Sequence, residues 1–359
     1  MSDAHNPPTA SVMSSHELPA DARQGDRLAL EPMDPQLTSI QPGGGFIVKL
    51  ELAWGRWRRW FLRTFRGGYV SRMHEKRRGE VNGCPHEPLD PRDLKYYRNQ
   101  DGYYWEPHDD PFAWRDRLPF ARAGLAELIV FSLITFAPAA VLGWMATTSS
   151  WPGWLSGVAW LAVAAICVIG LLIVWFFRDP KRAIPIGDDV VVSPADGKVV
   201  TIEEIEDHEF LEGRAVLIGI FLSIFNVHIN RMPIAGRVIG LRYKPGKCLN
   251  ALRPESAREN EHLAVRIEGA SAPHHRMIVR QITGAIARRI VCWLKPGDEL
   301  CKGDQFGMIK LGSRTELVLP LQEELKIRVS VGDTVRAGSS VMAEYVPSEK
   351  NAAADSEES

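Results

Sequence analysis

The run of residues from Leu128 to Phe177 constrains the fold of this chain more than any other feature. It is 50 residues long and contains no Asp, Glu, Lys, Arg or His. It divides into two apolar stretches, residues 128–146 and 154–177, joined by the turn-forming segment TTSSWPG. A helix needs about 20 residues to cross a bilayer core. Two helices in a soluble core are the alternative, but such helices normally carry a polar stripe, and neither stretch has one. The sequence therefore predicts a two-helix transmembrane hairpin within residues 123–177.

Positive charges flank both ends of this predicted hairpin. They are Arg115, Arg117 and Arg122 before the first span, and Arg178, Lys181 and Arg182 after the second. By the positive-inside rule, both ends of the hairpin lie in the cytoplasm. The first residues of the chain contain no apolar signal-peptide core, and their acidic residues are atypical of a mitochondrial transit peptide. We therefore expect the protein in the cell inner membrane, with its bulk on the cytoplasmic side.

The two ends of the chain and the segment before the hairpin differ in composition. Residues 1–45 are rich in Pro, Gly, Ser and acidic residues and poor in aromatic ones, which predicts disorder. Within residues 46–122, the stretch from Trp54 to Arg78 interleaves nine Arg or Lys residues with Trp, Phe and Tyr. Such a stretch lies in a bilayer interface, forms a solvated basic helix or packs on the soluble domain, and the sequence leaves these alternatives open. Residues 347–359 form an acidic tail that we expect to be frayed.

Charge and cysteine content exclude several classes of protein. The formal net charge is −1, so no global field attracts nucleic acid and no nucleic-acid partner is expected. The five cysteines are odd in number, and none of them forms a CxxC pair. This argues against a disulfide framework and against a zinc site. We therefore expect no bound metal and a reducing compartment.

Residues 178–346 have the pattern of a β domain. Short runs rich in Val and Ile alternate with Gly, Pro, Asp and Asn. Two segments in this region, PGDELCKGDQFGMI and VGDTVRAGSSVMAE, share the spacing GDxxxxG. Two such hairpins stacked face to face would resemble biotinyl and lipoyl carrier modules, although the Lys that carriers present is missing. The predicted fold is a mainly β domain with biotinyl/lipoyl-like barrel-sandwich elements, preceded by the transmembrane hairpin and a partly disordered N-terminal region.

Three short segments of this domain carry groups suited to activating a serine. FGMIKLGSRTELVLP interrupts a predicted strand with Gly312 and Ser313, VSPADGKVV places Asp196 in a turn, and FLSIFNVHINRMP contains His228. In a Ser, His and Asp set, the carboxylate orients the imidazole, which takes the hydroxyl proton. Each residue also has an ordinary interpretation, as a loop hydroxyl, a turn former or a half-buried strand residue. The sequence does not establish that the three meet.

Five segments in order resemble the motifs of the phosphatidylserine decarboxylase family, in its short bacterial and archaeal form. They are FFRDPKRAIP, VVSPADGKVV, FNVHINRMPIAGRV, RQITGAIARRIV and FGMIKLGSRTELVLP. The resemblance implies a proenzyme that cuts itself between Gly312 and Ser313. Ser313 Oγ, activated by His228 with Asp196 behind it, would attack the Gly312 carbonyl, and Ser313 would end as a pyruvoyl group. The expected products are a β chain, 1–312, and an α chain, 313–359.

The same resemblance implies the reaction and its partners. Phosphatidylserine would form a Schiff base with the pyruvoyl group, lose CO₂ and be protonated by His228 to give phosphatidylethanolamine, without metal or pyridoxal phosphate. The partners implied are phosphatidylserine, membrane lipid and the two chains from self-cleavage; whether a homo-oligomer forms is left open. Long forms of the family carry HxxH here, whereas this chain has Arg231 at the second position. His228 would then serve both tasks, or water would help.

Other functions remain open from the sequence. An archaetidylserine-type decarboxylase would act on ether-linked lipids with the same motifs. A membrane-bound serine hydrolase would use Asp196, His228 and Ser313, although LGSRTE is not the GxSxG elbow. A non-enzymatic membrane-anchored carrier or scaffold is disfavoured by the missing Lys.

Overall fold

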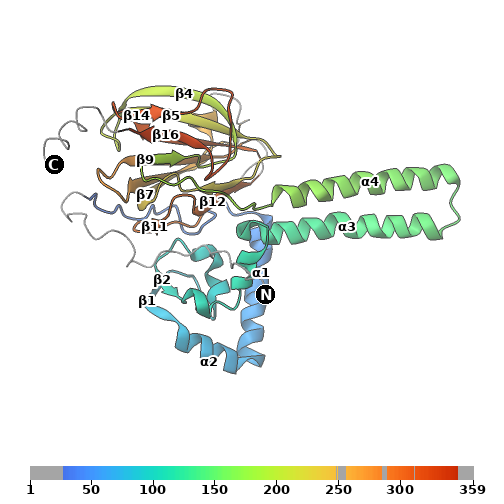
Figure 1. Cartoon of the computed structure of the whole chain (residues 1–359). Helices are drawn as coiled ribbons and strands as arrows, with labels where there is room; N and C mark the ends of the chain where they lie inside the picture. Colours follow the sequence, from blue (N-terminus) through green and yellow to red (C-terminus); the bar gives the residue numbers. More distant parts are fainter. Residues whose placement is uncertain (1–26, 248, 250–255, 285–288, 311, 347–359) are drawn as a thin grey trace, which may run out of the picture.

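The protein is described here by a computed structural model that covers residues 27–247, 249, 256–284, 289–310 and 312–346. Its predicted frayed tail, residues 347–359, lies outside the described residues. Figure 1 shows a β-rich body, a pair of long helices that project from it side by side, and a smaller N-terminal part at the base of this pair.

The projecting pair is α3 (Leu125–Thr148) and α4 (Gly153–Phe176). Both helices are long and apolar enough to cross a membrane. Their apolar side chains are mostly exposed, Leu161 to 72%, and only a few are covered by the neighbouring helix. A pair of core helices would bury these side chains, so the exposure argues for lipid as the surroundings. The two predicted spans coincide with these helices except at their ends: α3 begins three residues before the first predicted span, and α4 ends one residue before the end of the second.

The prediction of a mainly β domain is confirmed, and its strands form three antiparallel sheets. The eight-stranded sheet has the order β11-β7-β8-β9-β13-β5-β4-β15, and the two smaller sheets have the orders β10-β12-β6 and β14-β16-β3. The strands are β3 (Val190–Val192), β4 (Gly197–His208), β5 (Gly213–Leu222), β6 (Ile229–Arg231), β7 (Gly236–Lys244), β8 (His262–Gly269), β9 (Arg276–Ile282), β10 (Arg289–Cys292), β11 (Glu299–Leu300), β12 (Gln305–Lys310), β13 (Ser313–Pro320), β14 (Leu325–Ile327), β15 (Thr334–Val335) and β16 (Val341–Tyr345). A short helix, α5 (Ser256–Glu259), lies between β7 and β8.

Alternation along these strands builds the main core. In β8, Leu263, Val265 and Ile267 are buried, whereas the residues between them, Ala264 and Arg266, are only half-buried. Strand β5 of the same sheet contributes Ile218 and Ile220 to the same cluster. Each fully buried side chain of this size stabilises the fold by about 1.5–3 kcal/mol. The central strands of the large sheet are therefore the most strongly held part of the domain.

The two segments with GDxxxxG spacing form similar turns. Asp298 accepts the backbone N–H of Lys295 at 3.0 Å, and Asp333 accepts that of Ser330 at 2.8 Å. The glycine before each Asp has a positive φ, 93° at Gly297 and 106° at Gly332, which favours glycine. The strands that follow, β11 and β15, lie at the two ends of the eight-stranded sheet. The two segments thus share the same local turn, whereas their arrangement as a barrel-sandwich stays a prediction.

The N-terminal part packs against the β domain. Its elements are α1 (Phe46–Phe65), α2 (Gly67–Lys76), β1 (Arg78–Asn82), β2 (Gly102–Tyr104) and the 3₁₀ helices η1 (Pro91–Tyr97), η2 (Pro107–Asp109), η3 (Ala113–Arg117) and η4 (Arg122–Gly124). Residues 1–26 lie outside the described residues, but residues 27–45 are packed: Leu28 N–H donates to Glu268 at 2.7 Å, and Leu37 joins the main core. The predicted disorder is therefore not confirmed over residues 27–45.

Candidate active site

The Gly312 and Ser313 pair lies where the chain passes from one sheet to another. Strand β12 belongs to the small sheet with β10 and β6, whereas β13, which begins at Ser313, lies between β5 and β9 in the large sheet. Gly312 has a φ of 64°, in the left-handed region that favours glycine. The pair is a crossing point between two sheets, which explains why a polar, flexible pair interrupts an otherwise strand-like sequence.

His228 is buried next to this crossing, just before β6. Its Nε2 accepts the backbone N–H of Gly312 at 3.2 Å, and its Nδ1 donates to the carbonyl of Asn226 at 2.9 Å. These two bonds assign the proton to Nδ1 and leave the lone pair of Nε2 toward the Gly-Ser pair. Burial lowers the pKa of His228 to about 4. At neutral pH, the imidazole is therefore uncharged and able to accept a proton at Nε2.

The Ser313 hydroxyl is fully buried and makes no hydrogen bond with the described residues. An unpaired buried hydroxyl costs about 1–3 kcal/mol, so it is uncommon away from functional sites. Here it belongs to the residue after Gly312, whose amide already contacts His228 Nε2. A serine nucleophile has to be within hydrogen-bond reach of its base; here the Gly312 amide holds His228 Nε2 one residue from Ser313, while the hydroxyl itself makes no bond to the imidazole.

Asp196 does not lie behind His228 as expected. Its carboxylate accepts Arg182 Nη2 at 2.7 and 2.8 Å and the backbone N–H of Ala337 at 2.8 Å. The Nδ1 position of His228, where a triad aspartate would bind, is occupied by the carbonyl of Asn226. Among the hydrogen bonds of the described residues, none joins Asp196 to His228. The carboxylate instead links the segment after α4 to the segment around Ala337.

Arg231, at the position of the second His of the long forms, is held away from the imidazole. Its guanidinium donates to the Gly303 carbonyl at 2.9 Å and to Asp179 at 3.1 Å. Asp179 also accepts Gln305 Nε2 at 2.7 Å. These contacts fix the start of the β domain to β6 and β12, so Arg231 has a structural role.

A buried polar network that the sequence did not reveal supports β13. Asn230 Nδ2 donates to Thr315 Oγ1 at 3.1 Å, and Gln281 Nε2 donates to Asn230 Oδ1 at 2.9 Å. Thr315 and Ser313 lie on the same face of β13 because side chains alternate along a strand. The network ties β6 and β9 to that face. Each of these three strands also carries charged residues, so the sequence does not single out Asn230, Gln281 and Thr315.

A second buried group was also missed, just before the Gly-Ser pair. Lys310, at the end of β12, forms an ion pair with Glu127 in the first turn of α3 and donates to Gln41 at 3.0 Å. Both charged side chains are buried, and desolvation lowers the pKa of the Lys310 amine. The strand that leads to Gly312 is thus attached to the base of the helical hairpin.

The end of α4 also reaches this region. The Phe176 ring lies 4.5 Å from the His228 ring between centroids. Trp175 Nε1 and Arg178 Nη2 both donate to the Phe225 carbonyl, at 3.3 and 2.9 Å. Ile224 and Phe225 are exposed in the loop just before the His228 segment. The site therefore lies where the helical hairpin meets the β domain, next to an exposed apolar loop.

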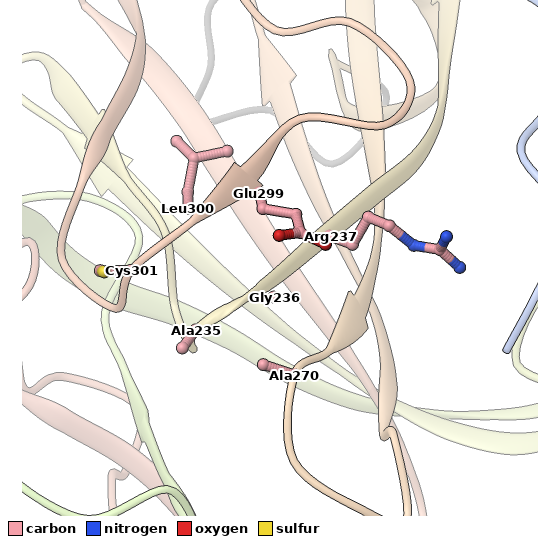
Figure 2. Close-up of a pocket in the computed structure, with 7 residues that line it drawn as sticks. All are labelled: Ala235, Gly236, Arg237, Ala270, Glu299, Leu300 and Cys301. Carbon is pink, nitrogen blue, oxygen red and sulfur yellow. The ribbon is translucent and has the colours of Figure 1, made fainter. Parts of the chain in front are cut away.

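A surface pocket elsewhere in the β domain lacks these residues. It lies between the start of β7 and β11 and is lined by Ala235, Gly236, Arg237, Ala270, Glu299, Leu300 and Cys301 (Figure 2). In the part of the chain that the structure describes, no group of three or more His, Cys, Asp or Glu side chains is placed to hold a metal ion. The polar groups around Gly312 and Ser313 are therefore the stronger candidate for chemistry.

Known proteins similar to this chain match this region. A family model described as phosphatidylserine decarboxylase matches residues 169–343. A protein named phosphatidylserine decarboxylase proenzyme from Rhodopirellula baltica is 52% identical over 252 residues, which cover 70% of this chain and 99% of that protein. Proteins of the same name from Symbiobacterium thermophilum and Syntrophus aciditrophicus are 45% and 38% identical, covering 52% and 63% of this chain and 84% and 97% of theirs. These matches confirm the resemblance found in the motifs.

Proposed function

The chain belongs to the phosphatidylserine decarboxylase family, and from this premise we propose that it cuts itself between Gly312 and Ser313 and then decarboxylates phosphatidylserine to phosphatidylethanolamine. The reaction class is that of a carboxy-lyase. The observation that carries the proposal is the contact of His228 Nε2 with the Gly312 amide beside the unpaired, buried hydroxyl of Ser313.

In the proposed cleavage, His228 Nε2 takes the proton of Ser313 Oγ. The oxygen attacks the carbonyl carbon of Gly312, and the bond from this carbon to the Ser313 nitrogen breaks as the nitrogen gains a proton. The amide thereby becomes an ester. Loss of the Ser313 Cα proton then expels the Gly312 carboxylate, and hydrolysis of the resulting dehydroalanine releases ammonia and leaves a pyruvoyl group. The positive φ of Gly312 is a backbone conformation that a residue with a side chain rarely adopts.

The residues present fit such a group, because its precursor hydroxyl is one of the buried polar atoms that have no hydrogen-bond partner among the described residues. When formed, the pyruvoyl group supplies an electrophilic carbonyl and an acceptor for the electrons left by CO₂. His228 is the group proposed to give a proton to the substrate carbon; because its Nε2 is unprotonated at rest, it must first take up that proton, for which the ammonium group of the substrate is the proposed source. Neither a metal nor pyridoxal phosphate is part of the proposal.

Asp196 has a positioning role in this proposal and does not act through His228. Its bond to the Ala337 amide joins residues on opposite sides of the proposed cut, and its ion pair with Arg182 connects both to the segment after α4. The carboxylate would thus help to keep the α chain, 313–359, seated on the β chain, 1–312.

The proposed location is the inner membrane, with the β domain on the cytoplasmic side. The positive residues that flank α3 and α4 support this orientation. The site lies at the end of α4 beside Phe225, on the side of the β domain that the hairpin would hold against the membrane. We also retain the barrel-sandwich arrangement of the two GDxxxxG segments as part of this proposal.

Intact mass spectrometry tests the proposal directly. The purified chain should give two products, and the α chain should begin with a blocked, hydroxylamine-sensitive group in place of Ser313. Ser313→Ala should yield one uncut chain that forms no phosphatidylethanolamine. An uncut wild-type chain with an ordinary serine would contradict the proposal and favour a serine hydrolase, which would instead release fatty acid or headgroup from the lipid.

A further inference from the structure

Helix α1 carries its ionic contacts on the face that packs against the protein. Arg58 pairs with Asp90, Arg59 Nη1 lies 3.3 Å from Asp93, and Glu51 pairs with Lys95. Ile47, Val48 and Leu62 are buried on the same side. The polar side chains that would normally face water are thus used to dock this helix on η1.

The face of α1 next to the docked one is apolar and exposed. It presents an aromatic stripe, made of five aromatic residues and one Leu at spacings of three or four, each between 37% and 74% exposed: Phe46, Leu50, Trp54, Trp57, Phe61 and Phe65. Such spacing places them along one side of a helix. Their rings contact one another, with centroids 4.8 Å apart for Trp54 and Trp57 and 5.7 Å for Trp57 and Phe61. A contiguous exposed patch of this kind marks an interaction surface.

The position of α1 identifies the partner that this stripe fits. In Figure 1, α1 starts close to the base of α3 and runs from there away from the α3 and α4 pair, crosswise to its long axis. Lys310 pairs with Glu127 in the first turn of α3 and also donates to Gln41, which lies shortly before α1. These contacts hold the start of α1 next to the start of α3. If α3 and α4 cross a bilayer, α1 therefore lies parallel to the membrane surface, at the level where headgroups begin. At 1.5 Å per residue it extends about 30 Å along that surface.

We propose that α1 is an interfacial membrane helix and that its aromatic stripe inserts into the boundary between headgroups and acyl chains. Trp and Phe are suited to this boundary. Exposed Arg56, Arg63 and Arg66 flank the stripe and supply positive charge for anionic headgroups. The helix would hold the β domain at a fixed height above the bilayer. This inference depends on the hairpin spanning the membrane and not on the proposed decarboxylation.

Site-specific photocrosslinking tests the inference on the full chain. The chain is reconstituted in nanodiscs of phosphatidylcholine and phosphatidylglycerol that carry an alkyne on the acyl chain. Trp57→p-benzoylphenylalanine should form a lipid adduct on irradiation, whereas the same substitution at Val331, an equally exposed apolar residue between β14 and β15, should form none. Phe46 and Phe65 substituted in the same way should label as Trp57 does.

Two outcomes would overturn the inference. One is a crosslink from position 57 to a second copy of the chain, which would assign the stripe to a dimer interface. The other is no adduct at position 57 while probes in α4, such as Leu161→p-benzoylphenylalanine, do label lipid. Repeating the measurement in the Ser313→Ala chain separates this result from the proposed self-cleavage, because the adducts should form equally in an uncut chain.

Discussion

At the scale of single residues, the imidazole of His228 combines deep burial with an unprotonated Nε2 whose lone pair accepts the Gly312 amide. Its two hydrogen bonds go to backbone atoms, from the Gly312 amide and to the Asn226 carbonyl. No carboxylate is therefore needed to fix its tautomer. This arrangement makes the proton-accepting atom available at the cut and keeps it uncharged at neutral pH.

His228→Gln should give an uncut chain, because an amide can accept the Gly312 N–H but cannot take the proton of Ser313. Gel analysis and intact mass of the purified variant check this. His262 provides a matched control, since its Nδ1 also bonds the carbonyl two residues earlier, at 3.0 Å from Asn260. His262→Gln should still be cut. If the His228→Gln chain is still cut, the imidazole is not the group that takes the Ser313 proton.

The low pKa of His228 also predicts how stability depends on pH. The folded pKa is about 4, below the ordinary value of 6.5, so the unfolded chain binds a proton more readily between these values. Stability should fall as pH decreases from 6.5 to 4, by roughly 3 kcal/mol from this residue. Unfolding measured in the Ser313→Ala chain, with and without His228→Gln, checks this; equal pH dependence in the two would contradict it.

The buried pair of Lys310 and Glu127 makes a second prediction at this scale. Lys310→Met leaves a buried carboxylate without its cation and should destabilise the protein by about 3–5 kcal/mol. Adding Glu127→Leu should recover most of this loss, because no charge then remains buried. Arg214→Met, which breaks an exposed pair with Glu204, should cost less than about 1 kcal/mol. Thermal unfolding of the four chains decides between these outcomes.

At the scale of elements, the long regular patterns were predictable and the contacts between distant segments were not. The uncharged run identified α3 and α4, and alternation identified strands such as β8, because both patterns are local. Residues 27–45 look disordered by composition, yet Leu37 joins a main core whose next buried member along the chain, Val191, is 154 residues away. Composition carries no information about such contacts.

The candidate site shows the same division. Gly312, Ser313 and His228 were identified from their motifs, and His228 and Gly312 are in contact. The link from Asp196 to His228 was expected by analogy with a triad, but Arg182 and Ala337 take the carboxylate. Lys310 and Glu127 could not have been paired from the sequence, because a lone Lys in a strand and a lone Glu before a span are both ordinary.

The loop from Ile224 to Phe225 predicts how the substrate reaches the site. The double change Ile224→Ser and Phe225→Ser should slow the conversion of phosphatidylserine in vesicles, because the loop loses apolar contact worth up to about 1.5–3 kcal/mol per side chain. Formation of phosphatidylethanolamine over time measures this, with the fraction of cut chain as a check on folding. Val331→Ser is the control and should not slow the reaction; unchanged rates in both would contradict a role for the loop.

At the scale of the whole molecule, the proposed cut lies before a central strand. Strand β13 pairs with β5 from Ser313 to Pro320 and with β9 on its other side, and β16 pairs with β3. The two chains should therefore elute together in size-exclusion chromatography in mild detergent and separate only on denaturation. Separation of the α chain under native conditions would contradict this pairing.

The central position of β13 also gives the cut a consequence for refolding. Before the cut, the last 47 residues find their place by closing a loop within one molecule, at a rate independent of concentration. After it, they would have to meet a separate β chain, so recovery from denaturation would become slower with every dilution. The working enzyme would then be a state that the chain reaches once, during its first folding, and does not regain readily when its two parts are dispersed.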